Sequence, residues 1–152
     1  MSNRLKFIIT EIISATFIFI FVYTAVSKII SHDSFAYVLR RSPLLGEFSN
    51  FVSWVIPAME IMISLLFIIP KFRRTGLSLS ASLMSLFTLY IGYMLLFTPE
   101  LPCSCGGVMN SLGWQEHLVF NICLTGLAFI GWRFSKTNKD FIAINRISRT
   151  PV

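Results

Sequence analysis

The stretch FIITEIISATFIFIFVYTAVSKII, residues 7–30, decides the fold class of this protein. It is apolar over almost its whole length, and Glu11 and Lys28 are its charged side chains. About 20 helical residues cross the roughly 30 Å of hydrocarbon in a bilayer. Backbone N–H and C=O groups find no water there, so a spanning segment must pair them internally. The stretch therefore predicts a transmembrane helix.

Three more segments share the length and apolar character of the first. They are residues 51–69, which end at Pro70, residues 76–97 and residues 114–132. The composition agrees, because the chain is 55% hydrophobic and only 13% charged, whereas soluble domains carry about 25% charged residues. We therefore predict an all-α fold, an integral membrane four-helix bundle that forms one transmembrane domain over residues 1–152.

Positive residues are distributed unevenly between the two sides of the predicted bundle. Of the 13 Lys and Arg residues, three lie on one side: Lys28, Arg40 and Arg41. The other side carries the rest, including those of the basic tail 133–152. Lys and Arg are enriched in cytoplasmic loops, so both termini are predicted to be cytoplasmic. This bias explains the net charge of +6 without a nucleic-acid partner. It places residues 98–113 in the periplasm, with the chain in a bacterial inner membrane.

The outward segment HDSFAYVLRRSP, residues 32–43, contains a candidate short helix over about residues 34–41. Asp33 or Ser34 can cap its start, and Pro43 stops it. The apolar residues that share one side of this helix are Phe35, Val38 and Leu39. We expect the helix to lie on the outer membrane face. The alternative is an ordinary loop with a hydrophobic contact.

Cys103 and Cys105 lie two positions apart in the second outward segment. Side chains at i and i+2 of an extended or turned segment can face the same side, within or near the reach of one disulfide. Closing so small a ring stabilises a fold little, whereas strained, exposed disulfides are typical of redox exchange. The pair therefore predicts a thiol–disulfide site. Two alternatives stay open: inert or structural cysteines, and half of a metal site with His117, although four-ligand zinc spacing is absent.

The surroundings of the two cysteines favour reactivity. Gly106 and Gly107 follow them and permit close approach by another chain. The fourth predicted helix begins soon afterwards, and a helix N-terminus favours a thiolate. Cys105, which is nearer that helix, is the predicted thiolate, and Cys103 is its partner. Cys123 lies inside the fourth helix, where we expect a buried packing residue.

The fourth predicted helix carries polar side chains on one face. Trp114, His117 and Asn121 are spaced by three and four residues, which places them on the same side of a helix. Polar groups within a span usually face the bundle interior or a cavity. His117 is a candidate proton shuttle for thiol exchange. The alternative is that His117 and Asn121 hydrogen-bond to neighbouring helices.

Glu60 lies midway along the second predicted helix, in the stretch WVIPAMEIMISL. A carboxylate at that depth is costly and marks a functional site by default. Lys28, near the outer end of the first helix, is its predicted partner, and we expect the pair to line a central cavity. The alternative is that Glu60 only ties helices together. Glu11 lies nearer the cytoplasmic end, where water or Arg4 and Lys6 can satisfy its charge.

Three short motifs occur in an order that resembles a known family. They are VSK at residues 26–28, PAMEIMISLLF at residues 57–67 and CSCGG at residues 103–107. Together they resemble the DoxX-like superfamily and, within it, the methylamine utilisation protein MauE group. The resemblance covers about residues 5–133. It implies a four-helix bundle in the bacterial inner membrane, linked to disulfide formation or electron transfer with periplasmic thioredoxin-like partners.

The resemblance also implies functional residues. The family's cysteine motif matches Cys103 and Cys105, its carboxylate matches Glu60, and its lysine matches Lys28. A looser likeness links the chain to vitamin K epoxide reductase-type enzymes, which are four-helix bundles with a redox pair at the start of the fourth helix and a quinone beside it. Those enzymes use Cys-x-x-Cys, whereas this chain has Cys-x-Cys and no outer shuttle pair.

These observations predict an inner-membrane thiol–disulfide redox protein, for which an oxidoreductase activity is one candidate. Cys103 and Cys105 would exchange electrons with a periplasmic protein, His117 would assist, and a quinone in the bundle is the candidate acceptor. The predicted cofactor-binding residues are Lys28, Glu60, Trp114 and Asn121. No resident metal is expected. The rival hypothesis is a non-enzymatic membrane subunit that anchors or helps assemble a larger envelope complex.

Overall fold

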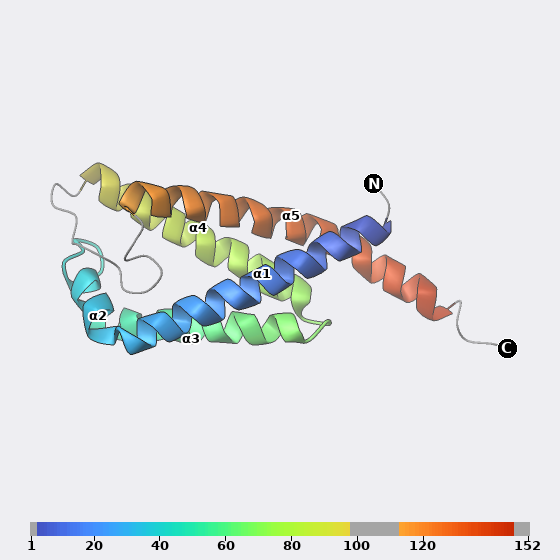
Figure 1. The fold of residues 1–152 in the computed structure, drawn as a ribbon, viewed down its shortest axis with the longest axis horizontal. Helices are drawn as coiled ribbons and strands as arrows, with labels where there is room; N and C mark the ends of the chain where they lie inside the picture. The colour runs from blue at the N-terminus through green and yellow to red at the C-terminus, as the bar shows by residue number, and fades with distance from the viewer. Residues whose placement is uncertain (1–2, 98–112, 148–152) are drawn as a thin grey trace.

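A computed structural model describes residues 3–97 and 113–147 of the chain. These residues form five α-helices and no strand (Figure 1). The helices are α1 (Asn3–Ile30), α2 (His32–Arg40), α3 (Ser49–Ile68), α4 (Arg73–Phe97) and α5 (Trp114–Ile147).

Four of the described helices, α1, α3, α4 and α5, are long and apolar enough to cross a membrane. This finding confirms the predicted all-α membrane bundle. The helices extend beyond the apolar runs at their polar ends, since backbone hydrogen bonding continues where side chains meet water. The largest extension is in α5, which continues from the predicted end at Trp132 to Ile147. Much of the basic tail is therefore helical.

The long helices form two packed pairs that are themselves joined through α1 and α5. α1 packs against α3, α4 packs against α5, and α1 also packs against α5. α2 lies at one end of the bundle against α3, while the start of α1, the α3–α4 turn and the far end of α5 lie toward the opposite end (Figure 1). We call the α2 end the outer end and the opposite end the inner end.

The inner half of the bundle, between Glu60 and the inner end, is closely packed. A Cβ atom added at Gly131 would lie 2.9 Å from Leu77 Cδ2 and 3.1 Å from Ile13 Cγ2. Small residues let membrane helices approach in this way. The glycine therefore allows α1, α4 and α5 to meet. The buried apolar cluster comprises Ile13, Phe17, Phe21, Ile63, Phe67, Leu77, Ala81, Leu83, Met84, Leu124 and Ala128.

The predicted short helix is present as α2, but its start differs from the prediction. Its N-cap is Ser31, with no side-chain cap hydrogen bond, rather than Asp33 or Ser34. The reason is that α1 runs almost directly into α2. The Ser31 N–H donates to the Ser27 carbonyl at 3.0 Å, so no separate cap is needed. The buried apolar side comprises Phe35, Ala36, Val38 and Leu39.

The prediction for Glu11 is wrong in its choice of partner. Its carboxylate forms an ion pair with Arg73, at the start of α4, rather than with Arg4 or Lys6. The α3–α4 turn returns the chain to the inner end, where α1 begins (Figure 1). The sequence shows that this turn is basic but not which helix it meets.

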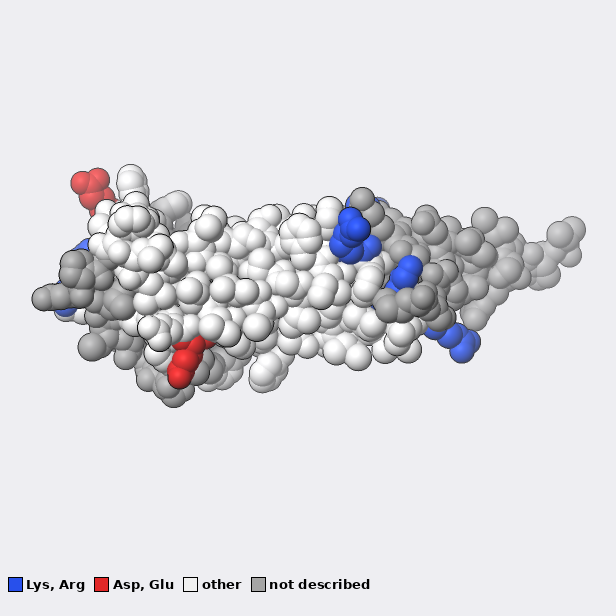
Figure 2. Space-filling view, turned by 90° about the horizontal axis from the view of Figure 1, so that it is seen from above, with Lys and Arg blue, Asp and Glu red and all other residues white. Residues whose placement is uncertain are grey.

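The prediction that Cys123 is buried is also wrong, because its side chain is exposed on the bundle surface as a free thiol. In a membrane the outside of a bundle is hydrocarbon. A small apolar thiol is satisfied there as well as in the core. On the face shown in Figure 2, a broad band of uncharged surface separates the charged residues toward the two ends, as contact with lipid tails requires.

Candidate functional site

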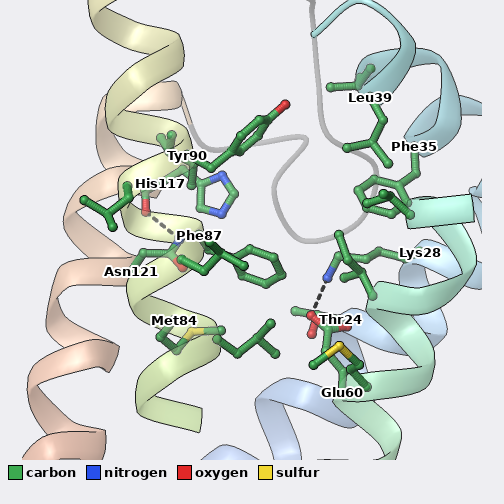
Figure 3. Close-up of a pocket in the computed structure, with 18 of the residues that line it drawn as sticks. Thr24, Lys28, Phe35, Leu39, Glu60, Met84, Phe87, Tyr90, His117 and Asn121 are labelled. Atoms are coloured by element: carbon green, nitrogen blue, oxygen red, sulfur yellow. Dashed lines mark hydrogen bonds and ion pairs between the residues drawn. The ribbon is translucent and has the colours of Figure 1, made fainter. Parts of the chain in front are cut away.

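A cavity of about 680 Å³ lies in the outer half of the bundle. It separates the α1–α3 pair from the α4–α5 pair, and all five described helices contribute to its lining (Figure 3). Its volume is in the usual range for small-molecule sites, which are mostly apolar with a few placed polar groups. The apolar lining includes Ile20, Val55, Met59, Phe87, Ile91 and Leu124.

The two ends of the cavity are set by different elements. Toward the inner end it is closed by members of the buried cluster, among them Phe21, Met84 and Leu124. Toward the outer end, the apolar side of α2 supplies Phe35 and Leu39. The cavity exists because the helices that meet at the inner end diverge toward α2, and α2 covers the space without filling it.

Lys28 and Glu60 form an ion pair on one wall of this cavity. The Lys28 Nζ of α1 lies 2.7 Å from the Glu60 Oε1 of α3. Glu60 is only 1% exposed, and both residues line the cavity. The Lys28 Nζ also lies 5.9 Å from the centroid of the Phe35 ring, a distance at which a cation is attracted to the ring face. The predicted pair and its cavity position are confirmed.

The second oxygen of the Glu60 carboxylate lacks a partner. Within the part of the chain that the structure describes, Glu60 Oε2 is buried and meets no hydrogen-bond donor. Thr24 lies beside it (Figure 3), but the Thr24 hydroxyl donates to the Phe21 carbonyl at 3.3 Å. A buried polar atom left unpaired costs about 1–3 kcal/mol, and a charged one costs more. A ligand in the cavity that donates a hydrogen bond to Glu60 Oε2 would therefore remove this cost.

The facing wall of the cavity carries the polar residues of α5. Trp114, His117 and Asn121 all line the cavity, so their predicted common face is confirmed. Asn121 Nδ2 donates to the His117 carbonyl at 3.0 Å. This hydrogen bond lies within α5 and is not the link between helices that was the alternative prediction for Asn121. His117 and Lys28 approach the cavity from opposite walls (Figure 3).

Thr24 and Tyr90 are among the polar cavity residues that were missed in the sequence. Thr24 lies one helical turn before Lys28 and on the same face, a spacing that indicates a shared lining. Tyr90 of α4 lies near His117 (Figure 3). A tyrosine hydroxyl within an apolar segment could have indicated a residue that faces a cavity. Both residues line the cavity.

His32 was also missed, and it fixes α2 above the cavity. Its Nε2 lies 3.0 Å from the Ser53 hydroxyl of α3, and its ring stacks on Trp54 at 4.3 Å between centroids. The hydrogen bond and the ring stacking together hold α2 against α3. Sequence spacing gave no sign of this contact, because it joins residues from two helices.

Two residues of α4 belong both to the cavity lining and to the exposed surface of the bundle. Leu86 and Leu89 line the cavity, yet they are 62% and 72% exposed. Both lie inside the candidate span of α4, where the surroundings are hydrocarbon. The apolar lining of the cavity therefore extends to exposed residues of α4.

Comparison with known proteins gives the family. The model of the family described as methylamine utilisation protein MauE matches residues 6–134. The chain belongs to the MauE family. No curated protein and no solved structure matches it. The match includes every residue that lines the cavity in this MauE-family protein, and the family name links such membrane proteins to methylamine utilisation.

The cysteine pair of this MauE-family protein, Cys103 and Cys105, lies outside the described residues, so its redox role stays a prediction. The segment that contains the pair leaves α4 after Phe97 and rejoins the described chain at Gly113. Both attachment points belong to the outer end of the bundle. Gly113 directly precedes Trp114, which lines the cavity.

Proposed function

We propose that this MauE-family protein is an inner-membrane thiol–disulfide redox protein. In this proposal, Cys103 and Cys105 exchange electrons with a thioredoxin-like protein of the periplasm. A lipid-soluble carrier of the quinone class occupies the cavity and serves as the electron acceptor. The observation that carries the proposal is the apolar cavity, which lies at the end of the bundle where the cysteine segment is attached.

The chemistry of the two sites balances. Oxidation of the Cys103 and Cys105 thiols to a disulfide forms one S–S bond and releases two protons and two electrons. Reduction of a quinone to a hydroquinone takes up two protons and two electrons. The cavity suits such a carrier, because its lining is mainly apolar and polar groups stand on two facing walls. His117 and the Lys28–Glu60 pair are the groups available to hold or move protons.

The outer position of the cysteines rests on charge. The basic residues of the α3–α4 turn and of the end of α5 belong to the inner end. Because positive residues favour the cytoplasm, the outer end faces the periplasm, where disulfides form and persist. The membrane is accordingly the inner membrane of a bacterium, and lipid surrounds the bundle.

A trapping experiment tests this function. Exchange passes through a mixed disulfide, and removing the resolving cysteine preserves that intermediate. We expect Cys103→Ser to leave Cys105 cross-linked to a periplasmic thioredoxin-like protein, and Cys105→Ser to trap less. Cys123→Ser is the matched control, because this thiol lies on the membrane-facing surface. It should trap nothing.

Two results would change the assignment. A stronger trap in Cys105→Ser would exchange the roles of the two thiols and keep the mechanism. If neither variant traps a protein, and a strain carrying both serines still grows normally on methylamine, the redox function is wrong. The protein would then act as a membrane subunit that anchors or assembles a larger complex.

A further inference from the structure

We infer that the cavity selects the reduced, hydroxyl-bearing form of its carrier through Glu60 and Lys28, and that the carrier enters from the bilayer beside α4. This inference rests on the proposed function, because it takes the ligand to be a quinone-type carrier. It adds the residues that recognise the head group, the route of access and a physical reason for the proposed direction of electron flow.

The route follows from exposure. Leu86 and Leu89 contribute to the lining and are also 62% and 72% exposed on the membrane-spanning part of α4. A ligand that enters past them crosses only apolar surface. A molecule with a long hydrocarbon tail can leave that tail among the lipids while its head occupies the cavity. A water-soluble ligand gains nothing from such a route.

Head-group selection follows from the unpaired carboxylate oxygen. Glu60 belongs to an ion pair with Lys28, and an ionised carboxylate only accepts hydrogen bonds. Among the described residues, none donates a hydrogen bond to its Oε2 atom, and the nearby Thr24 hydroxyl donates to the Phe21 carbonyl instead. The Lys28 ammonium carries three N–H donors, and one of them is directed at Glu60 Oε1. The wall therefore offers an acceptor and a donor side by side.

A hydroxyl group can hydrogen-bond to both the Glu60 carboxylate and the Lys28 ammonium, whereas a carbonyl group can hydrogen-bond only to the ammonium. A hydroquinone O–H donates to Glu60 Oε2 and accepts from the Lys28 Nζ. A quinone carbonyl accepts from Lys28 and leaves Oε2 unpaired. Buried groups that lose their partner discriminate strongly between such analogues. The hydroquinone should therefore bind at least about ten times more tightly than the quinone. This difference corresponds to one hydrogen bond to a charged group.

Preferential binding of the reduced form sets the direction of electron flow. A carrier whose reduced form binds more tightly becomes a stronger oxidant when bound. For a two-electron couple, a tenfold preference corresponds to about 30 mV. The cavity thus favours transfer of electrons from the protein thiols to the carrier.

Binding of decylubiquinol and decylubiquinone, measured by calorimetry without oxygen, tests the inference. The protein is the full chain in lipid nanodiscs, with both Cys103→Ser and Cys105→Ser, so that no thiol exchange takes place. We expect tighter binding of the reduced probe. Adding Glu60→Gln should abolish or reverse the preference, because the amide N–H now donates to the carbonyl. Glu11→Gln, which changes a carboxylate outside the cavity lining, should leave the preference unchanged.

A second variant leaves the ion pair intact. Val55→Trp, on the cavity wall of α3, should narrow the cavity and weaken the binding of both probes. Equal affinity for the two probes in the starting protein would overturn the selection by Glu60. Binding that survives Val55→Trp undiminished would overturn the location. Selective binding without cysteine trapping would support this inference and contradict thiol exchange. Trapping without any binding would support thiol exchange and contradict this inference.

Discussion

The inner and outer halves of the bundle are built from the same long helices, yet they are packed differently. In the inner half, a Cβ at Gly131 would lie 2.9 Å from Leu77, so α4 and α5 are in close contact there. In the outer half, the same helices enclose about 680 Å³. The difference agrees with the proposed ligand site in the outer half, since close helix contacts lie in the inner half and the cavity in the outer half.

The two ion pairs between helices follow the same division. In the outer pair, the Glu60 side chain is 2% exposed and that of Lys28 is 17% exposed. In the inner pair, the Glu11 side chain is 40% exposed beside Arg73. Desolvated charges depend strongly on their partners, whereas exposed pairs contribute little. The cavity pair should therefore be far more sensitive to substitution.

The largest expected effect comes from Glu60→Ala. This change leaves Lys28 as an uncompensated charge in the outer half, at a cost of roughly 3–5 kcal/mol of unfolding free energy. Adding Lys28→Met should recover part of that loss, because the unpaired charge is removed. Unfolding by detergent titration in mixed micelles measures both variants. A double variant whose loss equals the sum of the single losses would show that the two groups are not coupled.

The matched control is Glu11→Ala in the inner pair. Its expected cost is at most about 1 kcal/mol, because the carboxylate is partly solvated. A loss as large as that of Glu60→Ala would contradict the contrast between the two pairs.

A smaller effect is expected from Gly131→Ala. The added methyl group must displace Leu77 or Ile13, and overpacking of this kind costs about 1–3 kcal/mol. Gly126→Ala in the same helix is the control, because nothing lies within 4 Å of its added Cβ. Alanine is the better helix former by about 1 kcal/mol, so this control should be neutral or stabilising. Gly131→Ala should therefore lower the thermal midpoint, whereas Gly126→Ala should leave it unchanged or raise it.

The smallest effect is expected from Val55→Phe in the outer half. The larger ring extends into the cavity rather than into packed atoms, so unfolding free energy should change by no more than about 0.5 kcal/mol. Ala128→Phe is the contrast, since Ala128 is fully buried in the inner cluster. Equal destabilisation by both changes would mean that the outer half is packed as tightly as the inner half.

The sequence predicted those features that depend on one segment at a time. Apolar length located the four spans, and helical spacing placed His117 and Asn121 on one face of α5. Depth in the membrane, with the need for a counter-charge, identified Lys28 as the partner of Glu60. Such inferences succeed because the cost of a buried charge is large compared with other contributions.

Features that depend on how helices meet could not be predicted. The partner of Glu11 required the position of the α3–α4 turn relative to α1. Cys123 was misplaced because both sides of a membrane helix are apolar, so hydrophobicity does not distinguish core from lipid contact. The cavity depends on the divergence of the helices and on the seating of α2 through His32, and neither follows from periodicity.

The central claim, that the outer cavity connects a lipid-soluble carrier to the cysteine pair, is tested most directly by thiol counting. The fully reduced protein in nanodiscs is mixed with decylubiquinone without oxygen, and free thiols and hydroquinone are measured. We predict the loss of the Cys103 and Cys105 thiols, retention of the Cys123 thiol and formation of one hydroquinone per protein, with a slower reaction in Val55→Trp. Full retention of all thiols, or equal oxidation in Val55→Trp, would contradict the claim.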